Sequence, residues 1–68
     1  MKLIKWEDHV IPIDKILDIY YDDVFGCSII MELINGKKIE SHYKDEEYSA
    51  STMRELALDK LIVYLNEE

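Results

Sequence analysis

Histidine and carboxylate side chains are the groups in this sequence that could most readily do chemistry. Glu40 and His42 lie two residues apart in a β-prone segment, so both would project from one face of a strand. With a third ligand this pair could bind a metal ion, and Asp8 with His9 is the other such neighbourhood. The sequence has no Cys and His spacing typical of a zinc site. We favour a solvated strand face for Glu40 and His42, and we predict no resident metal or cofactor.

Nucleophilic catalysis and calcium binding have less support from the spacing of residues. Cys27 is the only cysteine, which excludes an internal disulfide, and a reactive thiolate would need a neighbouring base, so we expect a buried structural thiol. The acidic segments Asp22-Asp23 and Asp45-Glu46-Glu47 lack the alternating ligands and central glycine of a calcium loop. They are typical of turns and helix starts. Because no constellation implies a reaction, we predict that the protein is not an enzyme.

The charge balance limits the classes of partner. The formal net charge is −7, from 15 acidic and 8 basic residues, which argues against binding to nucleic-acid phosphates and to anionic membranes. No apolar run approaches the ~18 residues of a membrane span, and the N-terminus lacks the apolar core of a signal peptide. We expect a cytoplasmic protein with no nucleic-acid or membrane partner. The charge suggests a basic protein surface as an alternative partner, with mimicry of a nucleic acid as one form of that role.

The elements that would position these side chains are centred on a β-hairpin. Two β-prone runs flank Asn35-Gly36, which is a strong hairpin signal. A two-residue turn would place Met31 opposite Glu40, whereas a three-residue loop with a left-handed glycine would place Met31 opposite Ile39. A slip of one residue exchanges the two faces of a strand. We favour the three-residue loop because it pairs apolar residues; the tight turn would require both faces of the sheet to be covered.

The whole pattern predicts an α+β fold, in which an antiparallel sheet of about four strands in meander order carries one C-terminal helix across one face. Pro12 cannot donate a ladder hydrogen bond, so its segment is expected to be an edge strand or the end of one. The chain of 68 residues has room for a single domain, 1–68. Strand segments are expected near 2–6, 9–13, 16–21, 27–34 and 37–43. The helix is expected near 46–65 with Asp45 as its N-cap, or with a later start capped by Ser49 or Ser51.

The C-terminal helix has a wider apolar surface than one sheet needs. Its apolar residues cover an arc of ~180°, whereas a helix on a single sheet needs ~100° or somewhat more. A subunit of this size has little else with which to bury the excess. We therefore predict a self-associating interaction module, most simply a homodimer. The expected interface residues are five from the helix and one tyrosine from a strand: Leu56, Leu58, Ile62, Val63, Leu65 and Tyr20.

Three features occur together in a recognisable order. They are the segment Ile11 to Ile16, the segment Leu33 to Ile39, and an acidic start to the C-terminal helix. In this order the chain resembles many small bacterial and phage proteins of unknown function, and the flagellar FlbD-like proteins are an analogue. The resemblance covers most of the chain. It implies a β-meander followed by a helix, and it carries over no functional residues.

Overall fold

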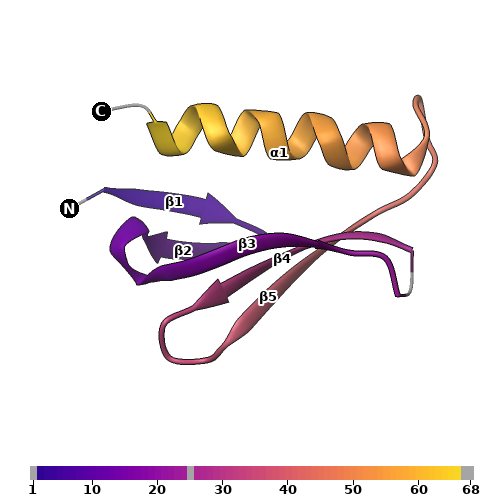
Figure 1. Cartoon of the computed structure of the whole chain (residues 1–68). Coiled ribbons are helices and arrows are strands. Elements are labelled where there is room, and N and C mark those ends of the chain that lie inside the picture. Colours follow the sequence, from indigo (N-terminus) through magenta and orange to yellow (C-terminus); the bar gives the residue numbers. More distant parts are fainter. Residues whose placement is uncertain (1, 25, 67–68) are drawn as a thin grey trace.

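The strands come first in the chain and the helix last, which is the order of an α+β protein. The computed structural model describes residues 2–24 and 26–66. The predicted α+β class is confirmed, and the helix packs on the strands as expected (Figure 1). The elements are β1 (Leu3–Trp6), β2 (His9–Pro12), the short 3-10 helix η1 (Ile13–Lys15), β3 (Ile16–Asp22), β4 (Cys27–Leu33), β5 (Lys38–Tyr43) and α1 (Ala50–Asn66).

The five strands in the described part of the chain divide between two antiparallel sheets, whereas the sequence pattern predicts one sheet of about four strands. One sheet is the β1–β2 hairpin, and the other has the order β3-β4-β5. The division falls at Pro12 and the 3-10 turn that follows it. Since proline has no N–H to donate and the turn redirects the chain, β2 does not continue into a ladder with β3. The prediction of an edge position for Pro12 agrees with the structure, because among the described strands β2 pairs only with β1.

The first hairpin closes through two residues with left-handed backbone. Glu7 has φ 48° and Asp8 has φ 67°, which is the signature of a two-residue type I′ turn. The resulting register pairs Ile4 with Ile11, and both side chains are buried. This turn therefore sets which residues of the hairpin face the interior of the protein.

The second hairpin has the three-residue loop that the apolar pattern favours. Met31 pairs with Ile39 and Cys27 pairs with Tyr43, so this prediction is confirmed. The backbone N–H of Leu33 donates to the carbonyl of Lys37 at 2.8 Å, which closes the loop. The glycine of the loop has φ +89°, a left-handed conformation that suits glycine far better than other residues.

Replacement of that glycine tests the loop. Gly36→Ala should lower the free energy of unfolding by about 1 kcal/mol, because a Cβ is strained at this φ while the space around it is open. Gly36→Asn should cost less, since asparagine tolerates left-handed backbone. Urea unfolding followed by the fluorescence of Trp6 measures both variants. An equal loss in the two variants would show that backbone strain is not the cause.

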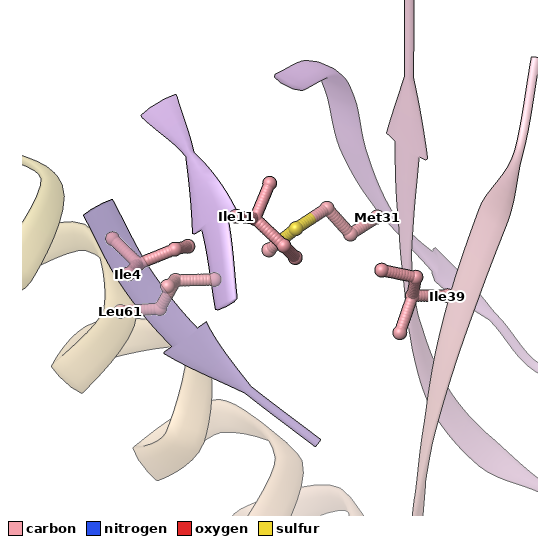
Figure 2. Close-up of a cluster of buried hydrophobic side chains, with 5 residues drawn as sticks. All are labelled: Ile4, Ile11, Met31, Ile39 and Leu61. Carbon is pink, nitrogen blue, oxygen red and sulfur yellow. The ribbon is translucent and has the colours of Figure 1, made fainter. Parts of the chain in front are cut away.

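The core lies where the two sheets and the helix meet. Met31 and Ile39 come from the three-stranded sheet, Ile4 and Ile11 from the hairpin, and Leu61 from α1 (Figure 2). All five side chains are buried. The hairpin and the helix therefore cover the same face of the three-stranded sheet, and neither alone supplies the core.

The helix begins at Ala50, later than the expected start near residue 46, and it has the alternative N-cap, Ser49. Ser49 is the N-cap: its Oγ accepts from the N–H of Thr52 at 3.3 Å. Asp45 accepts from the N–H of Ala50 at 2.6 Å across a preceding turn. The N–H of Glu46 is already used within that turn, where it donates to the carbonyl of Tyr48 at 2.9 Å. The acidic segment thus supports the helix start from outside the helix.

Candidate interaction surface of the C-terminal helix

The rotation of α1 about its own axis is set by two buried residues, Arg54 and Leu61, which are seven positions apart. Residues at this spacing lie on one line along a helix. Leu61 enters the core, whereas Arg54 forms an ion pair with Asp23, beyond the end of β3. The guanidinium also lies 4.0 Å from the centre of the Tyr21 ring, a cation–π distance. This line of the helix must therefore face the sheet.

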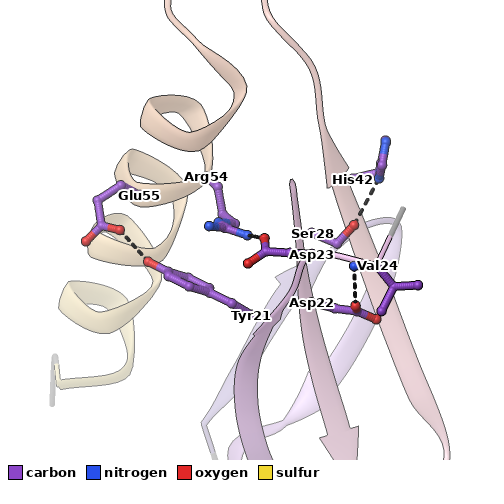
Figure 3. A network of polar contacts seen from close by, with 8 residues as sticks. All are labelled: Tyr21, Asp22, Asp23, Val24, Ser28, His42, Arg54 and Glu55. Atoms are coloured by element: carbon purple, nitrogen blue, oxygen red, sulfur yellow. Dashed lines mark hydrogen bonds and ion pairs between the residues drawn. The ribbon is translucent and has the colours of Figure 1, made fainter. Parts of the chain in front are cut away.

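A second contact reinforces this orientation. The hydroxyl of Tyr21 donates to the carboxylate of Glu55, so two consecutive helix residues, Arg54 and Glu55, both contact the end of β3 (Figure 3). The hydrogen bond from Arg54 to Asp23 raises the pKa of the guanidinium still further, which keeps it charged. The Nε atom of Arg54 is buried and has no hydrogen-bond partner among the described residues.

The contact between Tyr21 and Glu55 predicts a dependence of stability on alkaline pH. The hydrogen bond to Glu55 raises the pKa of Tyr21 above its ordinary value. Because the pKa of Tyr21 is higher in the folded state than in the unfolded state, the protonated hydroxyl stabilises the fold. This contribution is complete below the unfolded-state pKa, near 10.0, and it is lost as the pH rises through the folded-state pKa. Tyr21→Phe should therefore lower stability at pH 8 and reduce the further loss between pH 8 and pH 11.

Urea unfolding at a series of pH values measures this effect. Tyr20→Phe is the matched control, because Tyr20 is the neighbouring tyrosine and alternation places it on the other face of the sheet. Part of the alkaline loss should persist in Tyr21→Phe, since burial raises the pKa of Tyr43 as well. An unchanged pH profile in Tyr21→Phe would contradict the assigned role of the bond.

The orientation of α1 leaves apolar side chains facing outward. Leu56 is 52% exposed and Val63 is 66% exposed. They are seven positions apart, so they lie on one line opposite the buried line of the helix. We call these two residues the outer strip. Glu55 and Asp59 border it on one side, and Lys60 borders it on the other.

The other expected interface residues take different positions. Leu58, Ile62 and Leu65 follow another line of the helix, and of these Ile62 is exposed at 45% while Leu58 and Leu65 are half-buried. Leu65 packs against the core cluster. Tyr20 is half-buried and lies on the face of the three-stranded sheet that points away from α1. The six residues therefore do not form one continuous surface.

A groove of about 290 Å³ beside the helix extends the outer strip. It lies between β1 and α1 and is lined in part by Trp6, Lys60 and Tyr64. Lys2 donates from Nζ to the carbonyl of Tyr64 at 2.8 Å, which ties the start of β1 to the end of the helix. Because Lys60 borders both the groove and the outer strip, the two features form one surface on this side of α1.

The polar residues with potential for chemistry remain separate from this surface. His42 accepts or donates at Nδ1 across a 2.9 Å contact with the Oγ of Ser28, its partner in the register (Figure 3). Glu40 and His42 are both exposed on one face of β5, as expected from alternation. Among residues 2–24 and 26–66, no three His, Cys, Asp or Glu side chains gather closely enough to hold a metal ion.

Cys27 and the first acidic pair have structural neighbours. Cys27 is half-buried opposite Tyr43, and alternation places it on the other face from His42. Asp22 accepts from the N–H of Val24 at 2.9 Å, as turn chemistry predicts. The role of Asp23 in holding Arg54 was not predicted, because no local pattern links two residues that are 31 positions apart.

No protein-family model, no curated protein and no solved structure matches this sequence. Within the part of the chain that the structure describes, no helix has both the length and the apolar character to cross a membrane.

Proposed function

We propose that this protein is a non-enzymatic interaction module of the bacterial or phage cytoplasm that forms a homodimer through the outer strip of α1. The observation that carries the proposal is the exposure of Leu56 and Val63 on a helix whose rotation is held by Arg54 and Leu61. Large apolar side chains aligned along a helix are typical of helix–helix interfaces. A second copy presents the same strip, so the two surfaces are self-complementary in a two-fold pair.

The charges beside the strip favour a parallel pair of helices. In a parallel two-fold pair, each border of one helix faces the opposite border of its partner. The border of Glu55 and Asp59 would then lie against the border of Lys60. In an antiparallel pair each border would face its own copy, which brings acidic residues together. Complementary charge therefore selects the parallel arrangement.

Disulfide cross-linking tests this arrangement. In a Cys27→Ser background, Val63→Cys should oxidise rapidly to a covalent dimer, because equivalent positions of a parallel pair lie within reach of a disulfide. Ile62→Cys in the same background is the matched control, since Ile62 lies off the strip. Cross-linking of Val63→Cys that is no faster than that of Ile62→Cys would reject the parallel strip interface.

Light scattering over a concentration series tests the dimer itself. The mean mass should rise from one subunit toward two between ~10 µM and ~1 mM, the range in which an interface with few apolar side chains associates. A constant mass of one subunit at the highest concentration would remove the dimer from the proposal.

A specific observation also favours the second function, binding to a basic protein surface. Alternation places four carboxylates on the face of the three-stranded sheet that points away from α1, against one lysine, Lys38, opposite Glu32: Asp18, Asp22, Glu32 and Glu40. Such a face would attract and orient a basic partner. Glu32→Lys should weaken binding to a labelled oligolysine peptide, whereas Glu46→Lys, outside this face, is the control. Equal weakening by both would indicate attraction to net charge alone.

A further inference from the structure

A groove of about 450 Å³ lies on a different part of the molecule from the outer strip. It separates β2 from the loop that joins β4 and β5. Its buried residues, Ile11 and Ile39, belong to the core, while Val10 and Ile34 are exposed side chains along it. The groove therefore offers apolar contacts that the folded chain itself does not use.

The charge of this groove is opposite to that of the protein. Lys15 and Lys37 line it, together with His9. No carboxylate lines it among the described residues, although the whole chain has 15 acidic residues and a net charge of −7. Asp8 and Asp14 are sequence neighbours of His9 and Lys15, but neither is among the residues that line the groove. The groove is thus complementary to an acidic ligand.

One wall of the groove is the unpaired edge of a strand. The N–H of Ile13 donates to the carbonyl of Lys2 across the first hairpin. Because hydrogen-bonded pairs alternate in an antiparallel ladder, Ile11 also bonds toward β1, and the N–H and carbonyl of Val10 point away from it. β2 pairs with no second strand in the described chain. Val10 therefore presents one donor and one acceptor along the groove.

We propose that this groove binds an extended segment of another protein in which acidic and apolar residues alternate. The segment adds to the free edge of β2 at Val10, places its apolar side chains against Val10 and Ile34, and directs its carboxylates to Lys15 and Lys37. Backbone hydrogen bonds and alternate side-chain pockets are the two components of this mode of recognition. The site is independent of the helix surface, so it does not require the dimer.

The probe is a fluorescein-labelled peptide of about eight residues that alternates valine and glutamate, a typical strand length. Fluorescence polarisation should show saturable binding, at least tenfold weaker for a peptide that alternates valine and glutamine. Lys15→Glu and Lys37→Glu should each weaken binding about fivefold, the effect of losing one exposed charge pair. Lys44→Glu changes the net charge equally, away from the groove, and should change binding less than twofold.

Amide shifts in two-dimensional NMR locate the peptide. Addition of the valine–glutamate peptide should shift residues 9–12, 15 and 33–39, and N-methylation of alternate peptide amides should abolish binding. Shifts confined to α1, or equal weakening by Lys44→Glu and Lys37→Glu, would overturn the proposal. Displacement of the peptide from the same residues by dodecanoate would also overturn the proposal, because the groove would then be a site for a fatty-acid chain. The same shifts in the protein alone as its concentration rose would overturn it too, because the occupant would then be a second copy of the chain.

Discussion

Met31→Ala is expected to lower the free energy of unfolding by about 2–5 kcal/mol, the cost of truncating a large buried side chain. Met31 is 0% exposed and lies between Ile39 of the same sheet and Ile11 of the first hairpin. A small domain buries a limited apolar area and has a free energy of unfolding of similar size. The variant should therefore be largely unfolded at 25 °C.

Urea unfolding and near-ultraviolet circular dichroism measure this loss. Met53→Ala is the matched control, because Met53 is a half-buried methionine on α1 and alanine favours the helix. Its cost should stay below about 1 kcal/mol. Since Met31 contacts residues from both sheets, an equal effect of the two substitutions would show that the cluster in Figure 2 is not the centre of the core.

The double substitution Leu56→Ser and Val63→Ser should raise the dissociation constant of the proposed dimer about a thousandfold. Each of these side chains is roughly half exposed in one subunit. Burial of its exposed part in the dimer interface contributes about 1 kcal/mol to association. A pair of subunits loses four such contributions, or about 4 kcal/mol, which corresponds to about three orders of magnitude. Sedimentation equilibrium should therefore find the double variant as single subunits at every loading concentration up to ~1 mM, where the unchanged protein associates.

Leu17→Ser is the control for this experiment. Leu17 is an exposed apolar residue of β3, away from the helix, so its loss should leave the dissociation constant unchanged. The double variant should keep its helix content and its unfolding midpoint, because neither residue contributes to the core cluster. If Leu17→Ser weakened association as strongly, the attraction would be general apolar contact and not the outer strip.

Local patterns determined the second hairpin. The alternation of apolar residues along β4 and β5 selects one face, and Gly36 permits the loop that produces the matching register. The helix was also recognisable, because apolar residues recur along it at helical spacing. Its first residue was predicted less well, since Asp45 and Ser49 are both suitable caps and only the preceding turn distinguishes their roles.

The division into two sheets required more than a local pattern. Pro12 indicates an edge in the sequence, but the packing of the β1–β2 hairpin against Met31 depends on residues that are far apart in the chain. Strand alternation indicates which residues share a face of a sheet. It does not indicate which sheet packs against which other sheet. A single meander was therefore predicted where the 3-10 turn separates two sheets.

By itself, the sequence determined the class of fold, the hairpin register and the excess of apolar residues on the helix, because each depends on neighbours within a few positions. Tertiary structure alone decided which of those apolar residues face outward. Arg54 pairs with Asp23 and stacks on Tyr21, partners more than 30 positions away, and these contacts hold the rotation of α1. That rotation exposes Leu56 and Val63, whereas Leu65 packs against the core cluster.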